Sequence, residues 1–102
     1  MAITKQKRLP PIHPGEVVQD LLNESGLTVN ALAMALRVPA NRIGDIVKGR
    51  RGITADTALR LARYFGVSAQ MWVNLRARYD LAAAEDALAG RIEREVLPRP
   101  AA

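Results

Sequence analysis

One proline near the middle of the chain constrains the fold more than any other residue. Pro39 follows Val38, and a residue that precedes proline is displaced from the α-helical region, so a helix has to end here. Proline is also favoured in the first turn of a helix, so another helix can begin here. Apolar residues recur at helical spacing on both sides, at Leu32 and Leu36 and at Ile43 and Ile46. Residues 28–48 are therefore predicted to form two short helices joined by a tight turn.

Capping signals delimit three further helices. The first is opened by the residues from His13 to Glu16 and ends before Gly26. The others run from Thr54 to a stop at Gly66, and from Ser68 to about Ala84. Residues 91–97 are expected to add a short helix or strand, or to remain mobile. Because no strand-like alternation occurs, the prediction is an all-α fold of five helices with a short C-terminal extension.

The predicted organisation has three parts. Residues 1–12 form a basic N-terminal arm, residues 13–86 the helical domain, and residues 87–102 an extension that either dimerises or is disordered. The arm is either a solubilising tail or a contact to phosphates or a minor groove. Inward-facing positions at helical spacing predict the core: Val17, Val18, Leu21, Leu22, Ala31, Leu32, Ala35, Leu36, Ile43, Ile46, Val47, Ala58, Leu61, Ala62 and Phe65.

Positive charge gathers around the central turn. Residues 37–51 contain five basic residues against Asp45 alone, whereas residues 13–26 contain three acidic residues and no Lys or Arg. The net charge of the chain is +5, which favours a polyanionic partner such as nucleic acid. A membrane-surface protein would need a basic amphipathic helix, whereas these residues cluster at a turn. The alternative is a solvated basic face on a helical bundle.

The two helices within residues 28–48 have the pattern of a helix-turn-helix, whose second helix enters the major groove of DNA. The residues predicted to read bases are Ala40, Asn41, Arg42, Gly44 and Asp45. Asparagine pairs with adenine and arginine with guanine through two hydrogen bonds each. Asp45 either accepts from cytosine or pairs with Arg42 or Lys48 to orient them. The residues predicted to bind phosphates are Thr28, Asn30, Lys48, Arg50 and Arg51.

The chain contains few of the residues that catalytic sites usually need. The chain contains no cysteine and one histidine, which excludes disulfides, thiolate zinc sites and thiol catalysis. His13 and Glu16 have a spacing that could share a metal, but no third ligand accompanies them, so they are interpreted as a helix start set by Pro14. Neither paired carboxylates in a plausible cleft nor a glycine-rich phosphate loop is found. We therefore predict a non-enzymatic protein without metal or cofactor.

The chain resembles the HigA-type antitoxins of type II toxin–antitoxin systems, within the phage-repressor-like (XRE) helix-turn-helix family. The resemblance covers residues 10–85 and rests on the order of short motifs, namely His13 to Glu16, Leu27 and Thr28, Leu32 and Ala33, Ile43, Ile46, Lys48 to Arg51, Ile53 and Thr54, Ala58 to Ala62, Phe65 and Gly66, Trp72 to Leu75, and Tyr79 to Leu81. It implies a repressor-like domain and a homodimer that represses its own operon at an inverted repeat. It also implies neutralisation of a RelE-like ribonuclease toxin, in the bacterial cytoplasm and at the operator. The same DNA-binding residues would equally serve a stand-alone regulator without a toxin.

A dimer surface is expected on the fifth helix and the residues after it. A dimer reads two half-sites one helical turn apart, whereas a monomer reads only a few base pairs. The alanine-rich run from Leu81 to Ala89 would pack closely against a copy of itself. The candidate interface residues are Trp72, Arg76, Tyr79, Leu81 and Leu88, with Trp72 alternatively a core residue. The family often carries glutamine at the position of Arg76, so pairing at this position is expected to differ.

Overall fold

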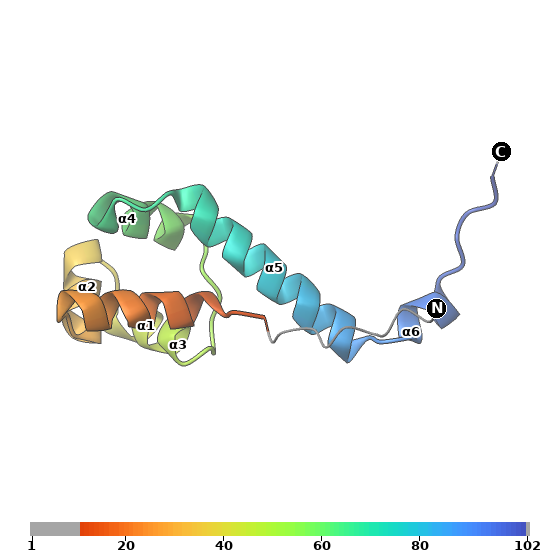
Figure 1. Ribbon diagram of the computed structural model, residues 1–102, viewed down its shortest axis with the longest axis horizontal. Helices are drawn as coiled ribbons and strands as arrows, with labels where there is room; N and C mark the ends of the chain where they lie inside the picture. Colours follow the sequence, from red (N-terminus) through yellow and green to blue (C-terminus); the bar gives the residue numbers. More distant parts are fainter. Residues whose placement is uncertain (1–10, 102) are drawn as a thin grey trace, which may run out of the picture.

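The computed structural model describes residues 11–101 and is entirely helical in its regular structure there. Its elements are α1 (Pro14–Ser25), α2 (Val29–Leu36), α3 (Ala40–Val47), α4 (Ala55–Phe65), α5 (Ala69–Ala87) and α6 (Arg91–Glu95). Helices α1 to α4 gather at one end of an elongated molecule, and α5 leads away from them to α6 (Figure 1). The predicted all-α fold is confirmed, and part of the segment 91–97 forms the short helix α6. Most of the predicted basic arm, residues 1–12, lies outside the described residues.

Helix α1 begins with a capping box. The Nδ1 atom of His13 accepts a hydrogen bond from the backbone N–H of Gly15 at 2.9 Å, and the Glu16 carboxylate accepts one from the backbone N–H of His13 at 3.0 Å. These bonds satisfy two of the backbone donors that every helix start leaves unpaired. The interpretation of His13 and Glu16 as a helix start is confirmed, and the imidazole itself is the cap. The His13 ring also makes an edge contact with Tyr79 of α5.

The starts of α2, α4 and α5 follow the sequence signals, and so does the end of α2 before Pro39. Thr28, Thr54 and Ser68 each accept a backbone N–H from the first turn of the helix they precede. Arg37 ends α2 in the left-handed region, with φ 61° and ψ 44°. A residue with a Cβ adopts this conformation at a cost of about 1 kcal/mol or more. The chain turns at Arg37, and Pro39 is then the N-cap of α3.

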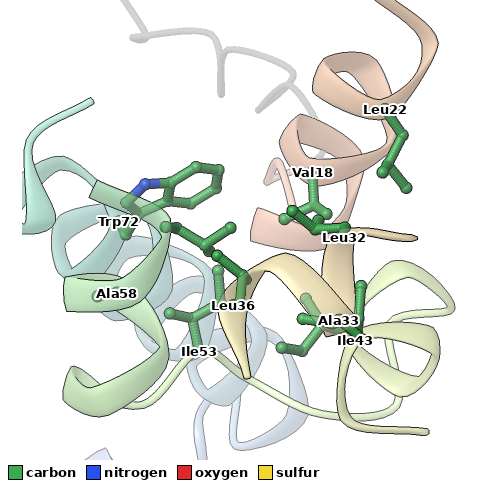
Figure 2. Packing of buried hydrophobic residues seen from close by; sticks show 11 residues of the cluster. Val18, Leu22, Leu32, Ala33, Leu36, Ile43, Ile53, Ala58 and Trp72 are labelled. Atoms are coloured by element: carbon green, nitrogen blue, oxygen red, sulfur yellow. The ribbon is translucent and has the colours of Figure 1, made fainter. Parts of the chain in front are cut away.

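The hydrophobic core lies between α1, α2, α3 and α4 and the start of α5 (Figure 2). Its buried members are Val18, Leu22, Leu32, Ala33, Leu36, Ile43, Ile46, Ile53, Ala58, Leu61 and Trp72. Most of the predicted core positions are among them or are half-buried against them. Ala35 is the exception, because it is exposed on the outer side of α2. Removal of these apolar side chains from water is the main stabilisation of the domain.

Helices α1 and α3 are in direct contact at a glycine. Gly15 is buried, and a Cβ atom at this position would overlap the carbonyl oxygen of Ile46. Because glycine carries no side chain, the first turn of α1 can lie directly on this backbone. Ile46 belongs to the last turn of α3, so the contact determines where α3 lies relative to α1.

Helix α5 is longer than predicted and extends beyond the core. It ends at Ala87 rather than near Ala84, and Leu81 on its outer half is 63% exposed. The start of α5 is different, because Trp72 there has no exposed surface. The assignment of Trp72 to a dimer surface is therefore wrong, since a fully buried side chain cannot contact a partner. Within the described residues, no helix combines the length and hydrophobicity that crossing a membrane requires.

Candidate nucleic-acid interface

Helix α3 has a buried side and a solvent-facing side. Ile43 and Ile46 are buried against α1 and α2, which turns the opposite side of the helix outward. Among the predicted base-reading residues, Ala40 and Asn41 are exposed, and Arg42, Gly44 and Asp45 are half-buried. The exposed residues lie in the first turn of α3, which is the part of a recognition helix that contacts base edges.

Gly44 lies on the side of α3 that faces the start of α2. The nearest atom to a Cβ placed there is Cγ1 of Val29, at 4.0 Å. This is ordinary van der Waals contact, so the backbone of α2 does not require glycine at this position. Because Gly44 has no side chain, nothing projects from α3 at this position beside the first turn of α2.

The predicted phosphate-binding residues are all exposed. Thr28 and Asn30 are exposed at the start of α2, and Lys48, Arg50 and Arg51 are exposed beyond the end of α3. The oxygen of Thr28 already accepts from the N–H of Ala31 at 3.0 Å, which leaves its hydroxyl proton available to donate. A helix N-terminus also attracts anions through its dipole and unpaired N–H groups. Hydrogen-bond donors are therefore exposed at the start of α2 and beyond the end of α3.

Asp45 pairs with neither of the residues expected. Its Oδ2 atom lies 3.7 Å from Nη2 of Arg51, in the loop after α3, instead of contacting Arg42 or Lys48. The loop turns back here, because the backbone N–H of Arg50 donates to the Asp45 carbonyl at 2.8 Å and Gly49 has φ 75°. This reversal brings Arg51 beside α3, which spacing along one helix could not reveal.

Arg42 instead pairs with Asp56, in the first turn of α4. The Nη1 atom of Arg42 donates to Oδ2 of Asp56 at 3.0 Å. Arg60 donates to the same carboxylate through Nε, at 3.2 Å to Oδ1 and 3.0 Å to Oδ2. Its Nη1 atom donates to the carbonyl oxygen of Leu36, at the end of α2, at 2.9 Å. These contacts connect α2, α3 and α4 at the edge of the candidate interface.

The Asp56 carboxylate is stabilised in its charged form by these partners. The hydrogen bond from Arg60 is the main cause of a lowered pKa for Asp56, and the charge of Arg60 and the contacts from Arg42 act in the same direction against partial desolvation. A lowered pKa means that the carboxylate stays ionised at neutral pH. Its contribution to stability is present above the pKa of the unfolded chain and is lost as the pH falls through the lower pKa of the folded chain.

A basic cavity of about 450 Å³ opens next to this network. It is lined by Arg37, Val38, Arg42, Arg51, Gly52, Thr54, Asp56, Thr57 and Arg60. The guanidinium groups come from the turn before α3, from α3 itself, from the loop after it and from α4. Sequence reasoning missed Arg37, Asp56 and Arg60 as neighbours of the interface. The spacing of Asp56 and Arg60 predicts an ion pair within one helix, but not the third partner from α3.

The remaining dimer candidates lie along α5 and just beyond it. Arg76 is exposed but held by two hydrogen bonds. Its Nη1 donates to the Ile53 carbonyl at 3.1 Å, and its Nε donates to Asp80 at 3.3 Å. It therefore holds the loop that follows α3 against α5. Tyr79 and Leu88 are half-buried, and Leu81 is exposed. The outer half of α5 thus presents apolar surface without cover from α1 to α4 (Figure 1).

The sequence matches a helix-turn-helix family model over residues 18–72. It is also 53% identical over 81 residues to virulence-associated protein I of Dichelobacter nodosus. These aligned residues cover 78% of this chain and 75% of that protein. The family model includes all of α2, α3 and α4, and thus the whole outward surface described above.

Two solved structures of antitoxins share the fold over most of their length. The HigA antitoxin of Pseudomonas aeruginosa, solved with the higBA promoter, is 49% identical, with a TM-score of 0.83 over 88% of this chain and 99% of that chain. A HigA-family addiction module antidote protein of Coxiella burnetii is 43% identical, with a TM-score of 0.81 over 89% of this chain and 100% of that chain. The chain therefore belongs to the helix-turn-helix family and, within it, to the HigA-type antitoxins, which are not enzymes.

Proposed function

We propose that this protein is an antitoxin that binds operator DNA as a homodimer and represses its own operon. In the same proposal it neutralises a RelE-like ribonuclease toxin in the bacterial cytoplasm. The observation that carries the DNA-binding part is the solvent-facing side of α3, flanked by basic residues, in a chain 49% identical to an antitoxin solved with promoter DNA. In this proposal α3 enters the major groove, while the start of α2 and the loop after α3 contact phosphates.

Fluorescence anisotropy tests operator binding directly. The labelled duplex is taken from immediately upstream of the reading frame of this chain, and a scrambled duplex of equal length is the control, both across a salt series. Specific recognition is expected to favour the native duplex by about a thousandfold or more. Equal affinity for both duplexes, with a steep salt dependence, would contradict specific repression and reduce the basic surface to a general attraction for polyanions.

The dimer and the toxin need separate measurements. Light scattering at micromolar concentration is expected to give about twice the chain mass of 11.1 kDa, and a mass of one chain would contradict the homodimer. For the toxin, the neighbouring reading frame is expressed alone and together with this chain. Toxicity that this chain relieves supports the antitoxin role, whereas a harmless neighbour would favour a stand-alone regulator.

Replacing Asn41 with alanine is expected to weaken binding to the operator by about 1–3 kcal/mol and to relax the preference at one base pair. The physical reason is the loss of a side-chain amide that can both donate to and accept from a base edge. Asn41 is exposed in the first turn of α3, so the domain should fold normally. Anisotropy against the operator and its single-base variants measures the effect. The matched control is Asn23→Ala on α1, and equal weakening on operator and scrambled DNA would refute the assignment of Asn41 to base reading.

Replacing Arg50 with alanine is expected to weaken binding to all duplexes to a similar extent. Arg50 is exposed in the loop after α3, and in the proposed binding mode its guanidinium group contacts a phosphate. Loss of one phosphate contact should lower the slope of log affinity against log salt by about 0.9. The salt series on operator and scrambled DNA gives this slope. Arg78→Ala on α5 is the control, and a loss confined to the operator would instead identify Arg50 as a base-reading residue.

A further inference from the structure

The ion-pair network at the edge of α3 joins one base-reading candidate to two residues of α4. Arg42 comes from the first turn of α3, Asp56 from the first turn of α4, and Arg60 from the next turn of α4. Asp56 Oδ2 lies 3.0 Å from both Arg42 Nη1 and Arg60 Nε, so a single carboxylate oxygen serves both guanidinium groups. The network therefore holds the Arg42 side chain from outside its own helix.

The carboxylate of Asp56 is itself held in place by Arg60. Arg60 uses its Nε for both oxygens of Asp56 and its Nη1 for the carbonyl oxygen of Leu36, at the C-terminal end of α2. This carbonyl belongs to the helix that packs directly against α3. Asp56 is thus positioned relative to the helix-turn-helix and not merely to α4. Rotation of the Asp56 side chain would break its contacts with both arginines.

These ion pairs contribute little to the stability of the fold. The side chains of Arg42 and Asp56 are 30% and 55% exposed, and exposed ion pairs are weakened by water and salt. A carboxylate next to a basic DNA-binding surface also repels phosphates, which lowers affinity for DNA in general. Its place here is better explained by an effect on Arg42, because an arginine in one fixed orientation loses less conformational freedom when it binds a base.

We propose that Asp56 is a positioning residue for DNA recognition, which holds the guanidinium group of Arg42 in the orientation that reads a base. This inference rests on the function proposed above. Asp56 occupies one hydrogen of Nη1, and Arg42 donates its Nε and Nη2 hydrogens to no other group among the described residues. These two donors lie side by side and match the two acceptors on the major-groove edge of guanine. Asp56 therefore raises selectivity through the orientation of Arg42, whereas its charge repels the phosphates of operator and unrelated DNA alike.

The test compares Asp56→Asn with the wild-type protein on the operator duplex and on the scrambled duplex. Asparagine keeps the size of the side chain but removes its charge, so Arg42 loses its anchor. Affinity for scrambled DNA is expected to rise and affinity for the operator to fall, so that the ratio of the two drops about fivefold or more. A residue with a structural role alone would change both affinities in the same direction. An unchanged ratio, within twofold, would overturn the inference.

A second substitution tests whether Asp56 acts through Arg42. In an Arg42→Ala background, Asp56→Asn is expected to leave the selectivity ratio unchanged, because the side chain that it positions is absent. A further loss of selectivity in this background would overturn the inference. Asp56→Glu, which keeps the charge, is expected to restore part of the ratio, and Asp20→Asn on α1 controls for the change in net charge.

The outcomes separate this inference from the function on which it rests. If the wild-type protein does not distinguish the operator from scrambled DNA, the proposed operator function fails and the role of Asp56 fails with it. If the wild-type protein does distinguish them and Asp56→Asn retains the same ratio, only the role of Asp56 is refuted. Thermal melts by circular dichroism establish that each variant is folded before its affinities are compared.

Discussion

Replacing Gly15 with alanine is expected to destabilise the domain by about 3 kcal/mol or more and to abolish operator binding. The added methyl group would overlap the carbonyl oxygen of Ile46 and approach its carbonyl carbon to 2.8 Å. A flexible side chain could rotate away from such a clash, but this obstacle is the backbone of α3. The helices α1 and α3 would have to separate, and α3 is the helix proposed to enter the major groove.

Urea unfolding followed by circular dichroism measures the first part of this prediction, and anisotropy on the operator duplex the second. The control for the unfolding measurement is Gly44→Ala, also at a helical glycine but with 4.0 Å between an added Cβ and its nearest neighbour. Alanine there is expected to stabilise α3 by up to about 1 kcal/mol through its higher helix propensity. If Gly15→Ala unfolded at the same urea concentration as the wild-type protein, α1 and α3 could not be packed as described.

Replacing Leu32 with aspartate is expected to unfold the domain completely. Leu32 is 0% exposed and lies in α2 within the central apolar cluster (Figure 2). A carboxylate at this position would be charged, buried and without a partner, at a cost of several kcal/mol in addition to the lost apolar contacts. A domain of this size has a total stability of about 5–15 kcal/mol, so the native state would not survive.

Far-ultraviolet circular dichroism and one-dimensional NMR detect this loss of structure. The milder Leu32→Ala is expected to fold with about 2–5 kcal/mol less stability, which keeps the prediction measurable. Met34→Asp is the matched control, because Met34 lies in the same helix and is 75% exposed. It should change the stability by about 0.5 kcal/mol or less. A cooperative, native-like melt of the Leu32→Asp variant would show that the side chain of Leu32 does not lie in the core.

Local sequence signals were sufficient for the helices and most of their ends. Proline, hydroxyl residues and glycine mark helix boundaries because each acts on backbone conformation or backbone hydrogen bonds within a few residues. Thr28, Thr54 and Ser68 stand at the predicted starts of their helices, and each is observed as an N-cap. The end of α5 was missed by three residues, since the alanine-rich run before Leu88 has no strong stop signal and alanine favours helix.

The candidate site was predictable only in part. Periodicity identified the outward residues of α3, such as Asn41, because Ile43 and Ile46 on the same helix had to face the core. It could not identify the partners of Arg42 and Asp45, because both partners lie on other segments. Asp56 is fourteen residues from Arg42, and no rule of helical spacing joins residues on two different helices.

The sequence by itself determined the all-helical fold, the position of the helix-turn-helix and the segment where positive charge gathers. These properties depend on interactions between residues at most a few positions apart, whose energies can be read from residue type and spacing. Tertiary structure alone decided that Gly15 packs on the Ile46 carbonyl, that Trp72 is a core residue, and that Asp56 holds Arg42. Each of these depends on how helices pack against one another, because packing brings together atoms from segments that are distant along the chain.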